Sequence, residues 1–192
     1  MSIKSSKGYV SFSLFGGGKT MRKIESICVL LICIIVMLSC TSTYSESGRV
    51  QTKTLARGAN IAIAACEDGV YGSKVYKDSG FVLARKIQDT LRPYTTNTEV
   101  IRDYRTIREF TADDLLKYDY VIIPTILQWE DRVTSWSGIA DKVTFAIDIY
   151  DRDGTLIQSA TLSGRGPNLT FGNAHVGQLL DEPLEGFFKQ SF

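Results

Sequence analysis

The chain has little of the residues from which many metal and redox sites are built. Histidine occurs once, at His175, so a metal site made from several histidines, or from Cys–His pairs, is excluded within one chain. The four cysteines form no CxxC pair, and only Cys66 lies beyond position 40, so no disulfide is expected within that part of the chain. We therefore expect no metal and no cofactor, and we interpret Cys66 as a small buried side chain at a strand end.

A surplus of basic residues is also missing. Residues 1–39 hold five of the 22 basic residues and one of the 21 acidic residues, so the remainder carries 17 basic and 20 acidic side chains, about −3 in net charge. Nucleic-acid binding needs concentrated Lys and Arg to displace counterions from phosphates. We therefore expect no nucleic-acid partner.

No apolar run is long enough to span a bilayer. The longest one, ICVLLICIIVML at 27–38, has twelve residues, whereas a membrane-spanning helix needs roughly twenty. It follows the positive flank Met21-Arg22-Lys23 and precedes a polar tract, which is typical of a secretory signal. We predict a signal peptide over 1–39, and Met21 as the true start because signals rarely carry such an upstream extension.

The run ends in Met37-Leu38-Ser39-Cys40, which resembles the lipobox of bacterial lipoproteins, with Met where Leu is usual. The resemblance implies that the chain is cut before Cys40 and that its thiol is acylated, for example by palmitate. Thr41 follows the cysteine, where proteins retained in the inner membrane often have Asp. We therefore expect a lipid anchor on Cys40, in the outer membrane facing the periplasm, and a flexible polar tether over 40–57.

The residues after the tether predict one α/β domain over 58–192. Apolar runs predict strands at 60–66, 98–101 and 120–127, with an irregularity at Pro124 in the last of these, which we expect to be central. Strict alternation predicts a hairpin of 143–150 and 155–163 around the turn Asp151–Gly154. Helical periodicity predicts helices that begin at Ser79, Thr111 and Pro183. We expect a mixed sheet of about five strands with two to three helices packed on it.

The richest candidate binding segment is QWEDRVTSWSGIAD at 128–141. Its recognition residues would be Trp129, Glu130, Asp131, Arg132 and Trp136, since Trp and Arg dominate binding hot spots. The alternative is a long hairpin whose tryptophans cover the sheet. A carboxylate pair for glycan cleavage would have to combine Glu130 with Asp148 of the next strand, because the neighbours Glu130 and Asp131 point to opposite faces.

Several short stretches are similar to a family of small bacterial lipoproteins, domain of unknown function 4823. The resemblance covers nearly everything after Arg57, implies a periplasmic lipoprotein, and implies no activity and no catalytic residues. The matching stretches are Tyr71-Gly72-Ser73, Asp119-Tyr120, 124–132 (PTILQWEDR), 136–139 (WSGI), Leu162-Ser163-Gly164 and Glu182-Pro183-Leu184.

No GxSxG elbow accompanies His175, so we interpret it as a loop histidine and find no convergent catalytic set. The leading hypothesis is a non-catalytic envelope module that binds a protein or a glycan through the segment between Trp129 and Trp136. The alternatives are a cell-wall glycan-active enzyme that uses Glu130, and a structural lipoprotein that assembles a larger complex.

Overall fold

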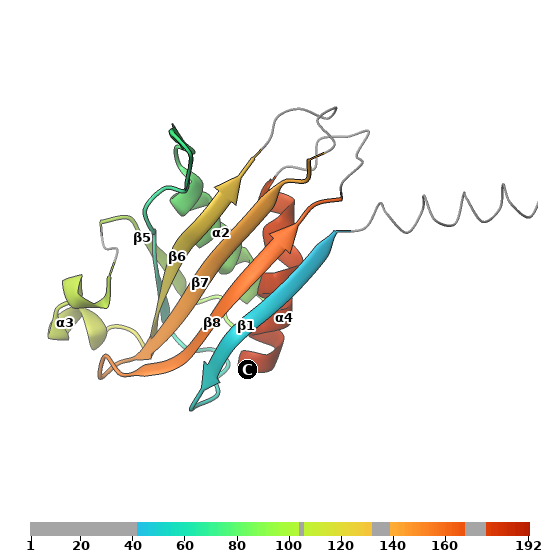
Figure 1. The fold of residues 1–192 in the computed structure, drawn as a ribbon. Coiled ribbons are helices and arrows are strands. Elements are labelled where there is room, and N and C mark those ends of the chain that lie inside the picture. Colours follow the sequence, from blue (N-terminus) through green and yellow to red (C-terminus); the bar gives the residue numbers. More distant parts are fainter. Residues whose placement is uncertain (1–41, 104–105, 132–138, 168–175) are drawn as a thin grey trace, which may run out of the picture. The chain divides into compact units, whose positions relative to one another are not determined.

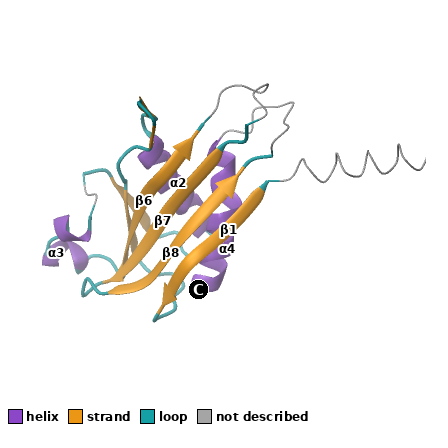
Figure 2. Cartoon of the chain, viewed as in Figure 1, coloured by secondary structure: helices purple, strands orange, loops and turns teal. Residues whose placement is uncertain are grey.

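A computed structural model describes residues 42–103, 106–131, 139–167 and 176–192. By its contacts the chain divides into two units, Met1–Leu38 and Ser39–Phe192, and the first lies outside the described residues. The second unit is an α/β fold with a mixed six-stranded sheet (Figures 1 and 2), which confirms the predicted fold class with one strand more than expected. The predicted acylation site Cys40 also lies outside the described residues.

The strands of the sheet are ordered β1-β8-β7-β6-β2-β5. Strands β6, β2 and β5 are parallel to one another, and β6, β7, β8 and β1 pair antiparallel. A separate two-stranded hairpin, β3–β4, is inserted after β2. The strands are β1 (Thr43–Gln51), β2 (Ile61–Ala64), β3 (Val70–Tyr71), β4 (Lys74–Val75), β5 (Thr98–Ile101), β6 (Tyr120–Glu130), β7 (Lys142–Asp151) and β8 (Leu156–Arg165).

Two layers of helices cover the sheet unequally. Helices α2 (Ser79–Leu91) and α4 (Asp181–Ser191), with the 3-10 turn η2 (Val176–Leu180), pack on one face (Figure 1). The turn η1 (Ile107–Glu109) and the short helix α3 (Ala112–Leu115) cover part of the other face, over β2 and β6. Within the described residues, no helix is both long enough and apolar enough to cross a membrane.

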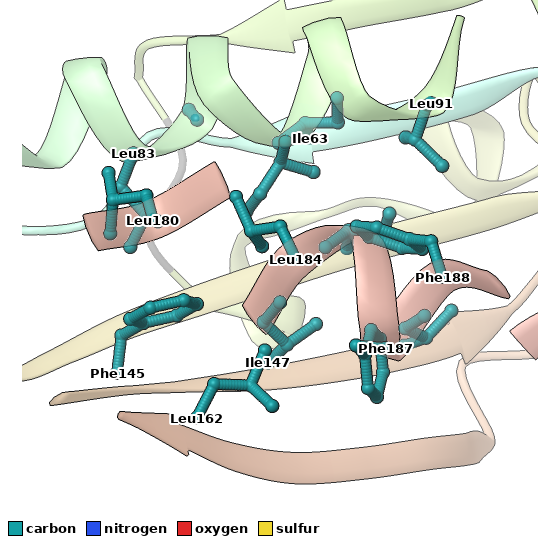
Figure 3. Close-up of a cluster of buried hydrophobic side chains, with 14 of the residues drawn as sticks. Ile63, Leu83, Leu91, Phe145, Ile147, Leu162, Leu180, Leu184, Phe187 and Phe188 are labelled. Atoms are coloured by element: carbon teal, nitrogen blue, oxygen red, sulfur yellow. The ribbon is translucent and has the colours of Figure 1, made fainter. Parts of the chain in front are cut away.

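The main core lies between the sheet and the pair α2 and α4 (Figure 3). The alternating residues of β7 point into it as predicted, and Val143, Phe145, Ile147 and Ile149 are fully buried. The other members that Figure 3 labels come from β2, β8, η2 and the two helices: Ile63, Leu83, Leu91, Leu162, Leu180, Leu184, Phe187 and Phe188. This apolar layer is the dominant source of stability, since burial of a large aliphatic or aromatic side chain contributes about 1.5–3 kcal/mol.

The prediction of a flexible tether over 40–57 is wrong for most of that segment. Residues Thr43–Gln51 form the edge strand β1, which pairs antiparallel with β8 from Thr43↔Arg165 to Gln51↔Gln158. Arg49 fastens β1 to α4: its guanidinium lies 4.9 Å from the ring centroid of Phe187 and donates a hydrogen bond to the Ser191 hydroxyl at 3.3 Å. Leu55 is buried in the core, and its N–H donates to the carbonyl of Ser191 at 2.8 Å.

The irregularity in β6 is real but lies at Leu127, not at Pro124 as predicted. The register with β7 is continuous through Pro124↔Ile147 and shifts between Ile126 and Gln128. Pro124 is tolerated because β2 pairs only with residues 120–122 of β6. At Pro124 β6 therefore has no β2 neighbour to which a backbone N–H would have to donate. The bulge exposes the side chain of Leu127 and reverses the facing of the residues that follow it.

Helix α2 is held tightly on the end of β2 by a glycine. A Cβ built on Gly80 would lie 2.0 Å from the carbonyl oxygen of Cys66, a distance that no side chain tolerates. Cys66 itself is buried two residues beyond β2, as predicted. The close approach of backbone to backbone therefore fixes where α2 begins.

We predict that Gly80→Ala destabilises the domain by about 1–3 kcal/mol, because the added methyl forces α2 away from Cys66. The matched control is Gly186→Ala in α4, where a Cβ meets no atom within 4 Å. This substitution should raise stability by up to about 1 kcal/mol through helix propensity. Urea denaturation followed by circular dichroism measures both, and equal midpoints for the two variants would contradict the packing described.

We also predict that a fragment 58–192, which lacks β1 and Leu55, is less stable than a fragment 42–192. Loss of the buried Leu55 side chain alone costs about 2–5 kcal/mol, and removal of β1 leaves β8 as an unprotected edge. The comparison is a pair of urea denaturation curves at one protein concentration. If both fragments unfold at the same urea concentration, residues 43–57 are a tether after all.

Candidate functional site

The carboxyl ends of β2 and β5 meet beside the N-terminus of α2, and a pocket of about 500 Å³ opens there. In open sheets with parallel strands this is the usual place for a ligand, because the connections leave the strand ends on opposite faces. Here α2 follows β2 on one face, whereas η1 and α3 follow β5 on the other. The pocket is lined by Ala65, Cys66, Glu67, Asp68, Val75, Asp78, Phe81 and Arg102.

Asp68 is the organising residue of the pocket. Its carboxylate accepts hydrogen bonds from the backbone N–H groups of Asp78 and Gly80, each at 3.0 Å. Ser79 stabilises the same turn, since its hydroxyl accepts a hydrogen bond from the N–H of Gly69 at 2.8 Å. The positive end of α2 is therefore satisfied by a carboxylate of the chain itself, in the place where α/β proteins that bind phosphate hold their ligand.

A guanidinium lies on the opposite wall. The Arg102 guanidinium carbon is 3.6 Å from the ring centroid of Phe81, so its charge is stacked on an aromatic face. Glu67 and Asp78 are exposed nearby. The pocket thus presents three carboxylates against one cation, and it does not favour an anionic ligand.

A second pocket, of about 270 Å³, lies on the other side of the segment Cys66–Asp68. Pro124, Thr125 and Ile126 of β6 form its far wall, and Thr106 contributes from the turn before η1. The two pockets share Cys66, Glu67 and Asp68, so one connection between β2 and α2 shapes both. No group of three or more His, Cys, Asp or Glu side chains within the described ranges is placed so that it could hold a metal ion.

Of the predicted recognition residues, the structure describes Trp129, Glu130 and Asp131, and the first two are buried. Trp129 is only 5% exposed and packs in the main core, where a Cβ on Gly69 would lie 2.5 Å from its Cβ. The prediction of a surface role is therefore wrong for Trp129, and the alternative of a sheet-covering tryptophan holds. Arg132 and Trp136 lie outside the described residues, as does His175.

Glu130 and Asp131 are held by their neighbours. Glu130 is 3% exposed and its carboxylate accepts a hydrogen bond from the side-chain amide of Gln128. The backbone carbonyl of Asp131 accepts a bond from the Tyr76 hydroxyl at 3.1 Å, which ties the end of β6 to the β2–α2 connection. Both residues therefore have structural partners.

The carboxylate pair considered for glycan cleavage does not form. Glu130 is in register with Lys142 on β7, whereas Asp148 is in register with Ile123. The two positions are separated by six residues along β7, about 20 Å, and glycosidases need their carboxyl groups about 5–10 Å apart. Asp148 instead accepts a hydrogen bond from the Ser159 hydroxyl at 2.6 Å.

Sequence reasoning missed the pocket at β2 and β5 because none of its residues forms a recognised motif. The one signal was the run of turn residues with three glycines between the first strand and the first helix, at Gly69, Gly72 and Gly80. Two of these glycines are required for close contacts, Gly69 with β6 and Gly80 with Cys66. An irregular connection of this kind at the end of a parallel strand is where a ligand crevice is expected.

The fold is shared with PelC from Paraburkholderia phytofirmans, a protein whose structure is a dodecamer. The two chains are 18% identical with a TM-score of 0.55, over 76% of this chain and 96% of PelC. A single-substitution variant of PelC, also a dodecamer, gives 18% identity and a TM-score of 0.52 over 76% and 95% of the two chains. At this identity the likeness shows the fold alone.

No curated protein sequence matches the chain. A family profile matches residues 53–191, which include every strand of the main sheet except β1 and all of the described helices. The same residues hold the pocket, the bulge in β6 and the hairpin β3–β4. The chain belongs to the family described as domain of unknown function 4823.

Proposed function

We propose that the protein is a lipid-anchored component of the bacterial cell envelope that acts by assembly with other proteins and not by catalysis. In this proposal the chain is cut before Cys40, the Cys40 thiol is acylated, and the domain stands on the outer membrane facing the periplasm. The observation that carries it is the start of the described fold, where β1 begins at Thr43, three residues after the predicted anchor.

This boundary matters because cleavage before Cys40 removes no part of the folded domain. The first described residue is Ser42, and β1 begins at Thr43. The apolar run 27–38 belongs to the other unit, so its removal leaves the core of the domain complete. A signal peptide has to be dispensable for the mature fold, and every described helix and strand begins after Ser42.

In this proposal acylation supplies the membrane affinity. Each buried methylene of a lipid chain contributes about 0.8 kcal/mol, and one chain alone holds a protein only marginally. The several chains that bacterial lipoproteins carry on such a cysteine are enough for stable attachment. The proposed anchor therefore accounts for attachment without a membrane-spanning helix, and no described helix could be one.

Assembly is favoured by the shared fold and by how the described acidic residues are used. PelC, which has this fold, forms a dodecamer. In this chain Asp68 caps α2, Glu130 is buried against Gln128 and Asp148 is bonded to Ser159, so each has a structural partner. A scaffold that presents surfaces to copies of itself or to another envelope protein fits these features.

We expect the full chain, expressed in a Gram-negative host, to incorporate radioactive palmitate and to sediment with membranes. Cys40→Ser should abolish both, because the thiol is the attachment atom. The matched control is Cys66→Ala, which removes the only other cysteine beyond the leader and should leave both unchanged. An unlabelled, soluble wild-type protein would refute the anchor.

We further expect the lipidated protein, extracted in mild detergent, to have a native mass that is a multiple of the chain mass. Native mass spectrometry gives this number directly. Chemical cross-linking in intact cells should give the same multiple, which excludes association caused by the detergent. A protein that is monomeric by both measurements, with no second component, would contradict assembly.

A further inference from the structure

The start of β1 and the end of β6 lie at the same end of the sheet. Thr43 is paired with Arg165, Arg165 with Lys142, and Lys142 with Glu130, which makes one row across four strands. Residues Cys40 to Thr43 are joined by three peptide units, which span at most about 11 Å when fully extended. A lipid on Cys40, the anchor proposed above on which this inference rests, would hold this end of the sheet at the membrane.

An apolar hairpin protrudes at the same end (Figure 1). Strands β3 and β4 follow Gly69, which packs against Trp129, the residue before Glu130 in the row just described. Their cross-strand partners Val70 and Val75 are 54% and 60% exposed. Tyr71 is exposed beside them, and Ile139 is exposed three residues before β7 begins.

The composition of the hairpin fits the boundary between lipid and water. Its sequence from Val70 to Val75 is VYGSKV, with valine at both ends, one tyrosine and one lysine. Tyrosine is enriched at membrane interfaces, and lysine keeps its ammonium group in water while its stem lies along apolar surface. Gly72, at φ +60°, allows the tight turn between the strands.

The opposite end of the domain has a different character. There the β7–β8 turn places Arg152 and Asp153 in solvent, and Arg152 is ion-paired with Asp119. Exposed apolar residues also lie near that end, at Val50, Leu116 and Leu156, but they belong to separate elements and form no hairpin. The exposed apolar residues at the far end are therefore scattered, whereas at the end where β1 begins the hairpin gathers Val70, Tyr71 and Val75 beside the acidic pocket that Val75 lines.

We propose that the β3–β4 hairpin is a membrane-contacting element, and that the domain rests on the bilayer with this end of the sheet toward the lipid. The lipid on Cys40 brings the domain to the surface, and Val70, Tyr71 and Val75 enter the headgroup region. The strands then run roughly along the membrane normal, and the β7–β8 turn points away from the bilayer.

The test uses the full lipidated chain in the Cys66→Ala background, where acylation occupies Cys40 and cleavage has removed Cys28 and Cys33. A nitroxide is attached at Val75→Cys, or at Arg152→Cys as the matched position at the far end. The protein is reconstituted into vesicles of phosphatidylethanolamine and phosphatidylglycerol. Collisions with oxygen, which is enriched in lipid, and with a water-soluble nickel complex are measured by electron paramagnetic resonance.

We expect the label at position 75 to lose accessibility to the nickel complex and to gain collisions with oxygen, whereas position 152 keeps full access to nickel. Ile139→Cys, from a different element at the same end, should follow position 75. Equal nickel access at positions 75 and 152 overturns the proposal. Dipolar broadening at position 75 also overturns it, since the hairpin then rests on a second copy.

Failure of the anchor gives a separate result. A chain that is not acylated at Cys40 does not float with the vesicles at all, whichever position is labelled. That outcome refutes the proposed function, whereas a floating protein with a water-exposed hairpin refutes only the proposed orientation.

Discussion

The antiparallel ladder between β1 and β8 determines how the domain is attached to anything that precedes it. The ladder begins at Thr43 and runs for most of the length of β8, and Arg49 binds the strand to α4 through Phe187 and Ser191. A strand fixed in this way cannot act as a spacer. The distance between the proposed anchor and the fold is therefore set by three residues, and the rest of the 40–57 segment is part of the domain.

A second constraint comes from the connection between β2 and α2. Gly80 allows α2 to start against Cys66, and Asp68 closes the helix end with two hydrogen bonds. The chain between these contacts must then turn outward, and Gly69 presses it against Trp129. The pocket and the projecting hairpin are both products of this one tightly held connection.

Regular periodicity made most of the fold predictable, and the failures have specific physical causes. Strands β2, β5, β6, β7 and β8 and helices α2 and α4 carry apolar patterns that match their burial. Strand β1, TYSESGRVQ, has no such pattern because both of its faces are largely polar, and it is stabilised by pairing with β8 and by Arg49. Those interactions come from residues more than a hundred positions away, which local sequence cannot reveal.

The prediction that Trp129 is a surface residue failed because the alternation of side chains between the two faces of β6 shifts by one residue within the strand. Up to the bulge the even-numbered residues Tyr120, Ile122 and Ile126 face α2 and α4, and simple alternation would send Trp129 to the opposite face. The shift at Leu127 reverses this facing, so Trp129 enters the core while Gln128 and Glu130 share the other face and bond to each other.

That phase shift also decides what the end of the sheet where β1 begins can present. Trp129 packs in the core against Gly69, and among the described residues of this end Tyr71 of the hairpin is an exposed aromatic side chain. In the proposed orientation the pocket at β2 and β5, which Val75 lines, opens beside the lipid surface. In the same orientation the half-exposed hydroxyl face of β7 and β8, which includes Thr144, Thr161 and Ser163, runs along the membrane normal.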